Sequence, residues 1–115
     1  MQLEERIVGD VTVLALSGRM TRDEEHGYLK ERINDLVQDG QRKLVLNMAA
    51  VSYMDSTCIG EIVSGLVTVR NSGGALHLAN LTEPIERLMS VAGLMSLFQT
   101  FGSEHEAVRS LAPAD

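Results

Sequence analysis

The chain has 115 residues, of which 44% are hydrophobic, and its formal net charge at pH 7 is −6. This length is typical of one domain, so we expect a single domain over residues 1–115. No apolar run approaches the ~20 residues that span a bilayer. The acidic N-terminus also lacks the basic and then apolar pattern of a secretory signal. These features predict a cytoplasmic protein without membrane insertion.

The composition also argues against several kinds of ligand. The ten Lys and Arg residues are spread along the chain, and only 3% of the residues are aromatic. Neither a basic surface for phosphate backbones nor a stacking platform for bases is therefore indicated. The single cysteine, Cys58, cannot form an internal disulfide, and the three histidines show no metal-ligand spacing. We expect no cofactor, no metal and no direct nucleic acid, which leaves a protein as the expected partner.

The N-terminal third predicts a hairpin followed by a helix. Two β-favouring runs, 3–8 and 11–16, flank a Gly-Asp dipeptide, which is a typical hairpin turn. A hydrophobic pattern with the 3.6-residue period of a helix follows within residues 21–40 and ends at a glycine. The positions with this period are Tyr28, Leu29, Ile33, Leu36 and Val37.

The middle of the chain predicts the centre of the sheet and the clearest helix. Residues 43–48 contain three consecutive large aliphatic residues, as expected of a strand covered on both faces, so this strand should be central. Residues 56–72 carry a helical hydrophobic stripe that ends before an Asn-Ser-Gly-Gly stretch. The stripe consists of Ile59, Ile62, Val63, Leu66 and Val67.

The C-terminal part continues the alternation of strands and helices. We predict a strand at 75–79, a helix beginning near Thr82, a strand at 97–101 and a helix at 103–111. The core positions expected in the helix near Thr82 are Ile85, Leu88, Met89 and Ala92. Because parallel strands need crossover helices, this order predicts the α/β class. The expected architecture is a mixed central β-sheet of four to five strands with four helices packed on it.

The segment with the most distinctive chemistry lies at the start of the helix predicted at 56–72. Asp55, Ser56 and Thr57 place one carboxylate and two hydroxyls where an extended segment becomes helical. In one interpretation Asp55 or Ser56 only caps the helix, and Ser56→Ala would then remove a cap. Ser56 has no Gly-x-Ser-x-Gly elbow and no recognisable histidine partner, and no phosphate-binding glycine motif occurs. We therefore expect no catalytic residues and no enzyme activity.

The same segment resembles the central signature of anti-sigma factor antagonists, which are STAS-domain proteins. The similarity is carried by Val45–Met48, Val51–Thr57 and Gly60. It continues in the expected order along nearly the whole chain, through Gly18, Gly73-Gly74, Ile85–Leu88 and Gly93-Leu94.

The resemblance implies a function in partner switching. It implies that Ser56 is phosphorylated by an anti-sigma factor that is also a serine kinase. The unmodified protein would bind this anti-sigma factor, the phosphorylated protein would release it, and a PP2C-type phosphatase would remove the phosphate. A helix N-terminus can accept a phosphate, because its amides and partial positive charge favour an anion.

Residue spacing suggests where the partner binds. Small and polar residues recur at helical spacing on the side of helix 56–72 away from its hydrophobic stripe, where another backbone could approach closely. Alternatively, Gly60 or Gly65 lies against the sheet. The candidate partner-binding residues are Asp55, Ser56, Thr57, Gly60, Glu61, Ser64, Thr68 and, before the first helix, Thr21.

A second function stays open at this point. The chain reads Gly18-Arg19-Met20-Thr21 where many antagonists have an acidic residue after the glycine. This departure is compatible with a non-switching STAS adaptor subunit of a transporter or sensory protein complex. Cys58 also replaces a common glycine, and we expect it to be a small packing residue, not a reactive thiol.

Overall fold

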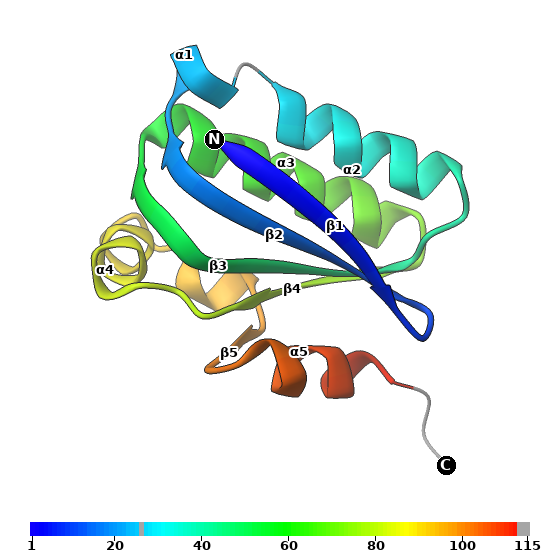
Figure 1. Ribbon diagram of the computed structural model, residues 1–115. Coiled ribbons are helices and arrows are strands. Elements are labelled where there is room, and N and C mark those ends of the chain that lie inside the picture. The colour runs from blue at the N-terminus through cyan, green and yellow to red at the C-terminus, as the bar shows by residue number, and fades with distance from the viewer. Residues whose placement is uncertain (26, 113–115) are drawn as a thin grey trace.

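Figure 1 shows a computed structural model of the chain, in which residues 1–25 and 27–112 are described. The strands are β1 (Gln2–Val8), β2 (Val11–Met20), β3 (Lys43–Met54), β4 (Ala75–Ala79) and β5 (Thr100–Phe101). The helices are α1 (Arg22–Glu25), α2 (Tyr28–Gln38), α3 (Ser56–Asn71), α4 (Glu83–Val91), the 3₁₀ turn η1 (Met95–Leu97) and α5 (Glu104–Leu111). No helix within these described ranges is long and apolar enough to cross a membrane.

The five strands form one mixed sheet in the order β1-β2-β3-β4-β5. The hairpin strands β1 and β2 are antiparallel, and the pairs β2–β3, β3–β4 and β4–β5 are parallel. Each parallel connection passes through at least one helix, as the geometry of parallel strands requires. The predicted α/β class and mixed sheet are confirmed, and β3 is central as expected.

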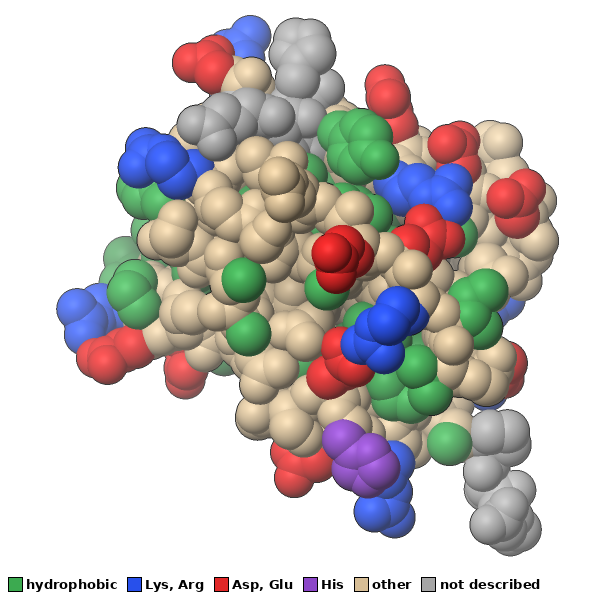
Figure 2. Space-filling view, in the orientation of Figure 1, with side chains coloured by type: hydrophobic (Ala, Val, Ile, Leu, Met, Phe, Trp, Pro, Cys, Tyr) green, Lys and Arg blue, Asp and Glu red, His purple; other side chains and the backbone are tan. Residues whose placement is uncertain are grey.

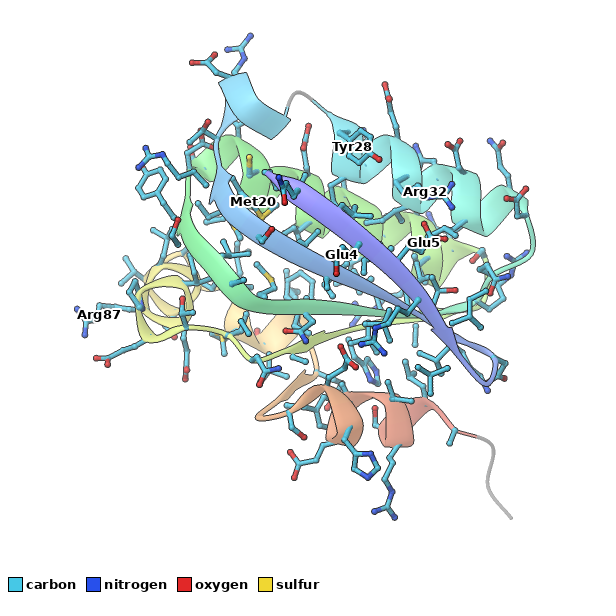
Figure 3. The ribbon with its side chains drawn as sticks, viewed as in Figure 1. Glu4, Glu5, Met20, Tyr28, Arg32 and Arg87 are labelled. Atoms are coloured by element: carbon cyan, nitrogen blue, oxygen red, sulfur yellow. The ribbon has the colours of Figure 1, made fainter. Side chains whose placement is uncertain are left out.

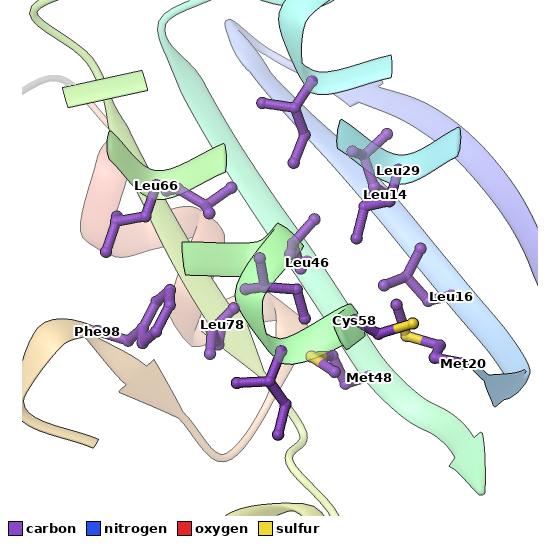
Figure 4. Packing of buried hydrophobic residues seen from close by; sticks show 14 of the residues in the cluster. Leu14, Leu16, Met20, Leu29, Leu46, Met48, Cys58, Leu66, Leu78 and Phe98 are labelled. Atoms are coloured by element: carbon purple, nitrogen blue, oxygen red, sulfur yellow. The ribbon is translucent and has the colours of Figure 1, made fainter. Parts of the chain in front are cut away.

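Helices cover both faces of the sheet and produce two hydrophobic clusters. In Figure 1, α2 and α3 lie on one face and α5 lies on the other. Figure 4 shows the larger cluster, in which leucines from three neighbouring strands pack with Leu66 of α3; these leucines are Leu14, Leu46 and Leu78. The smaller cluster is formed by Val11, Val13, Val45 and Ala79 of the sheet with Ala107 and Leu111 of α5. The consecutive aliphatic residues of β3 are therefore buried on both faces, for the reason that predicted a central strand.

Strands β2 and β3 extend beyond the predicted ends at residues 16 and 48. Their parallel pairing continues to Met20↔Met54, with two register shifts on the way. The small and polar residues in this part do not indicate a strand by themselves. Met20, Val51 and Met54 are nevertheless buried and hold the extension in the core. The extension of β3 ends at Met54, so Asp55 alone connects it to Ser56 at the start of α3.

The helix predicted within residues 21–40 is in fact two helices, α1 and α2. Gly27 lies between them with a φ of 79°, a left-handed conformation that glycine adopts without strain. Leu29, Ile33 and Leu36 are buried as predicted, whereas Tyr28 is exposed at the first turn of α2 and Val37 is half-buried.

Helix α3 is rotated relative to the prediction. Its buried residues are Cys58, Ile59, Ile62, Gly65, Leu66 and Val69, whereas Val67 is 50% exposed. The cause is that α3 packs against α2 as well as the sheet. A Cβ placed on Gly65 would lie only 2.7 Å from Cδ1 of Ile33, so this glycine allows the close approach of the two helices. Gly65 is thus buried, but against α2, while Gly60 is exposed with open space around it.

The C-terminal elements follow the prediction with smaller differences. In α4, Ile85 and Met89 are buried as expected, but Leu88 and Ala92 are exposed because only one narrow face of this helix meets the core. The strand predicted at 97–101 is reduced to β5, since the preceding residues form η1. Ser103 caps α5, its hydroxyl accepting a hydrogen bond from the Glu106 amide at 3.1 Å.

Gly74→Ala should destabilise the fold strongly. A Cβ at this position would lie 2.2 Å from the carbonyl oxygen of Arg42, a backbone atom that also accepts the Ala75 amide. We expect the free energy of unfolding in urea to fall by about 2 kcal/mol. Gly60→Ala is the matched control in open space on α3 and should raise it by about 0.5 to 1 kcal/mol. Equal unfolding curves for the two variants would contradict this account of the packing.

Candidate functional site

The candidate site lies where the ends of β2 and β3 meet the start of α3. Met20 and Met54 are opposite each other at the end of the parallel pair. The next residue, Asp55, donates its backbone amide to the carbonyl oxygen of Met20 at 3.0 Å. This bond keeps the chain beside β2 at the point where it leaves the sheet and becomes helical.

The Asp55 carboxylate joins two chain segments that are far apart in sequence. Its Oδ1 accepts a hydrogen bond from the Cys58 amide at 3.0 Å and thereby caps α3. Its Oδ2 accepts one from the Arg22 amide, the first residue of α1, at 2.9 Å. Both bonds stabilise the charged carboxylate, and the bond from Cys58 has the larger effect. They lower the pKa of Asp55 below its ordinary value of 3.8.

Ser56 is the first residue of α3, and both Ser56 and Thr57 are exposed. The interpretation that Ser56 caps the helix is wrong, because the cap is the Asp55 carboxylate. The expectation that Ser56→Ala would remove a cap is wrong for the same reason. Asp55 thus holds the start of α3, and the Ser56 hydroxyl lies at the surface.

The other candidate residues are exposed to different degrees. Gly60 is exposed on the outer side of α3, whereas Ser64 and Thr68 are half-buried. The Thr68 hydroxyl donates to the carbonyl oxygen of Ser64 at 3.1 Å, so it bonds within its own helix. That these residues bind a partner stays a prediction.

Two more candidates lie toward α1 and α2. Glu61 is half-buried, and its Oε1 would be 3.7 Å from a Cβ placed on Gly27, so its carboxylate faces the junction of α1 and α2. Thr21 is half-buried between β2 and α1, one residue before the Arg22 amide that binds Asp55. The structure therefore brings Thr21 close to the start of α3.

The sequence analysis did not predict the surface positions of three residues beside this site, because it assigned Val67 to the hydrophobic stripe and did not pair Arg19 with Tyr53. Val67 is exposed on the same outer side of α3 as Gly60, where a hydrophobic side chain has no core contact to explain it. Arg19 and Tyr53 are opposite each other in β2 and β3, and the guanidinium carbon of Arg19 lies 4.7 Å from the centre of the Tyr53 ring. Only the strand register could have revealed this stacked pair, because 33 residues separate its members.

Cys58 is fully buried in the larger hydrophobic cluster, among the side chains that Figure 4 shows. Its burial confirms the prediction of a small packing residue. A buried thiol of this kind is inaccessible to oxidants and partner cysteines.

A family model described as the STAS domain matches residues 2–107. The chain belongs to the STAS domain family. A protein of Thermotoga maritima described as a candidate anti-sigma factor antagonist is 26% identical over 106 residues, which cover 92% of this chain and 94% of the relative. The anti-sigma-B factor antagonist of Staphylococcus aureus is 35% identical over 69 residues, which cover 60% of this chain and 64% of that protein.

Solved STAS structures have the same fold. The crystal structure of a candidate anti-sigma factor antagonist from Thermotoga maritima has a TM-score of 0.85 at 26% identity, covering 95% of this chain and 93% of the other. The anti-sigma factor antagonist SpoIIAA in its unphosphorylated form has a TM-score of 0.80 at 19% identity, covering 97% of this chain and 100% of the other. The second likeness is evidence for the fold alone.

The Asp55 bonds predict a specific pH dependence of stability. The folded state lowers the pKa of this carboxyl. The stability that the charged carboxylate contributes is therefore complete when the pH is above its unfolded-state pKa near 3.8, and it is lost as the pH falls through the lower pKa of the folded state. The stability advantage of the wild type over Asp55→Asn should therefore shrink as the pH is lowered from 7 to 3. Urea unfolding across this range measures it, with Asp35→Asn, an exposed site on α2, as the control. A constant difference between wild type and Asp55→Asn would show that the carboxylate charge is not involved.

Proposed function

We propose that this STAS protein is a cytoplasmic anti-sigma factor antagonist that acts by phosphorylation-dependent partner switching and has no enzyme activity of its own. In the unphosphorylated state it binds an anti-sigma factor that is also a serine kinase. This kinase phosphorylates Ser56 and is released, and a PP2C-type phosphatase restores the binding form. The observation that carries the proposal is an exposed serine at the first position of α3, directly after the aspartate that caps the helix.

The start of α3 suits a phosphate because modification there breaks no contact that holds the fold. Asp55 supplies the cap, so a phosphate on Ser56 replaces no structural bond of the serine hydroxyl. The helix has 16 residues, and its N-terminus attracts negative charge. The phosphate also lies beside the Asp55 carboxylate, and this repulsion offsets part of the attraction. We therefore expect little change in stability and a large change in surface charge.

The surface next to Ser56 explains how a phosphate would release a partner. Gly60 and Val67 lie on the outer side of α3 and offer a small residue and an apolar one where another helix or loop can approach. A phosphate adds a charge of about −1.5 to −2 at the end of this surface. An apolar partner surface would then bind more weakly because contact would desolvate the phosphate. An acidic partner surface would bind more weakly because like charges repel.

The named relatives support the same cycle. The Staphylococcus aureus relative is named for antagonism of an anti-sigma-B factor. SpoIIAA of Bacillus has been solved in phosphorylated and unphosphorylated forms, and both resemble this chain in fold, with TM-scores of 0.77 and 0.80. The particular kinase and phosphatase of this chain belong to the proposal.

Phosphorylation of Ser56 is the first test of the proposal. The partner anti-sigma kinase with ATP should add one phosphate, located on Ser56 by mass spectrometry. In calorimetric titration the phosphoprotein should bind the kinase at least about tenfold more weakly, which corresponds to about 1.4 kcal/mol. Ser56→Ala should bind like the wild type and change the free energy of unfolding by no more than about 0.5 kcal/mol, because Ser56 is not the cap.

Thr57→Ala is the matched control for this experiment and should still be phosphorylated. A phosphate on Thr57 instead of Ser56 would contradict the assignment of Ser56 as the phosphorylated residue. Equal binding by wild type, phosphoprotein and Ser56→Ala would favour the other function, a non-switching STAS adaptor in a transporter or sensory complex. The stacked Arg19 and the half-buried Thr21, where many antagonists have an acidic residue, keep that adaptor as the specific alternative.

Val67→Glu tests whether the outer side of α3 is the partner surface. Val67 is half exposed and can carry a charge without entering the core, so we expect unchanged thermal melting but at least about tenfold weaker binding to the anti-sigma factor. Val91→Glu is the matched control, because Val91 is 84% exposed at the end of α4. Equal losses of affinity in the two variants would reflect general charge repulsion, and no loss in Val67→Glu would exclude this side of α3.

A further inference from the structure

The seven-residue strand β1 forms one edge of the sheet. Within the described part of the chain, β1 pairs only with β2, so its other side is open for pairing. Leu3 is half-buried against the larger cluster, whereas Ile7, on the same face of the strand, is 66% exposed. A long edge strand with an exposed isoleucine is a surface to which another strand can be added.

The hairpin turn determines which backbone groups of β1 point outward. Val8 and Val11 flank a two-residue turn in which Gly9 has a φ of 64°, so they form a hydrogen-bonded pair of the ladder. Such pairs alternate with non-bonded ones along an antiparallel ladder. Gln2, Glu4, Arg6 and Val8 therefore direct their backbone groups toward β2. Leu3, Glu5 and Ile7 direct theirs to the open edge.

A second copy of β1 can pair antiparallel with these outward groups, and the three registers with the most paired residues are centred on Glu4, Glu5 or Arg6. A centre at Glu4 places the two Glu4 side chains opposite each other, and a centre at Arg6 does the same with the two arginines. A centre at Glu5 pairs Glu4 with Arg6 of the second copy twice and Leu3 with Ile7 of the second copy twice. Opposite charges and apolar pairs across neighbouring strands each stabilise the pairing, whereas like charges oppose it.

We infer that β1 is a self-association surface, on which two copies of this chain pair their β1 strands antiparallel about a two-fold axis at Glu5. Leu3, Glu5 and Ile7 of each copy then exchange backbone hydrogen bonds with the other copy. The interface uses the same residues on both sides, as a two-fold dimer requires. It involves β1, α2 and the Glu104 end of α5 but not α3, so its outcome is independent of the function proposed for Ser56.

The pairing of Glu5 with itself is compatible with this arrangement because each Glu5 carries its own cation. Figure 3 shows Glu5 and Arg32 of α2 side by side, and the guanidinium donates to both carboxylate oxygens at 2.7 and 2.8 Å. This bidentate pair lowers the pKa of Glu5, mainly through the hydrogen bond from Arg32. The two carboxylates that meet at the axis are thus each neutralised within their own chain.

The exposed Ile7 also finds an apolar environment in the second copy. Opposite Leu3 it lies beside a hollow of about 420 Å³ lined by Met1, Gln2, Leu3, Glu4 and Tyr28. Figure 3 shows Tyr28 of α2 next to the end of β1, where its exposed ring borders this hollow. Pairing therefore covers two apolar side chains, Ile7 and Tyr28, that the single chain leaves in water.

Charged residues on an edge strand usually prevent association, and β1 carries three of them. In β1, however, the charged residues are ordered so that Glu4 of one copy meets Arg6 of the other. Figure 2 shows acidic and basic side chains next to small hydrophobic patches along the position of β1. Arg6 contacts Glu104 of α5 through one nitrogen of its guanidinium, a group with five N–H donors, so a carboxylate from the second copy can join the same pair. Glu4 of the second copy supplies it.

Sedimentation equilibrium from micromolar to millimolar protein tests the inference. The mass should rise with concentration from the 12.5 kDa of one chain to twice that value. Glu4→Arg places an arginine opposite Arg6 in each of the two cross-strand pairs and should weaken the dimer at least about tenfold. The double exchange Glu4→Arg with Arg6→Glu should restore it. Glu86→Arg, on the exposed side of α4, changes the net charge equally and should leave the dimer intact.

Disulfide trapping tests the register separately. Glu5→Cys places two cysteines at the two-fold axis and should give a covalent dimer on mild oxidation, whereas Glu4→Cys and Arg6→Cys should give much less. The buried Cys58 does not compete. Circular dichroism of each variant establishes that it is folded. A chain that stays monomeric over the whole concentration range, a dimer unaffected by Glu4→Arg, or preferential trapping through Glu4→Cys or Arg6→Cys would each overturn the inference.

Discussion

The Asp55 carboxylate is the constraint on which the rest of the site depends. It accepts one amide from the start of α3 and another from the start of α1, while its own amide is bound to the end of β2. Three chain segments are thereby fixed around one residue. Because Asp55 does this, Ser56 has no structural bond to lose at the surface. A modification there can change the charge of the surface without changing the fold beneath it.

The close contact of α2 and α3 decides which side of α3 faces outward. Gly65 lets Ile33 approach α3, and the helix consequently buries a face that includes Cys58 and Val69 as well as the residues toward the sheet. Val67 turns to the solvent as a result. The surface available to a partner next to Ser56 is therefore set by packing on the opposite side of the helix, at positions that no partner would touch.

Local patterns predicted the elements well, and tertiary contacts explain the differences. The strand at 75–79 and the helix starting at Ser56 have the predicted positions, since each has a strong pattern bounded by clear turn residues. The extension of β2 and β3 could not be read locally, because each strand is held there only by the other. The rotation of α3 depends on its contact with Ile33 of α2, and the hydrophobic periodicity of α3 alone gives no information about this contact. At the site, Asp55 and Ser56 were found from their motif, but which of them caps the helix required the geometry.

The two edges of the sheet differ in a way that limits how copies of this chain can associate. At one edge, β1 offers seven residues, whereas β5 at the other edge has only two and is followed at once by the turn into α5. A two-residue strand presents too few backbone groups to hold another strand, and short edges of this kind generally prevent sheet growth. Association through β1 about a two-fold axis uses that edge in both copies and leaves only the short edges outside. Such an assembly closes at two chains, with the start of α3 on each chain still beyond the edge that pairs.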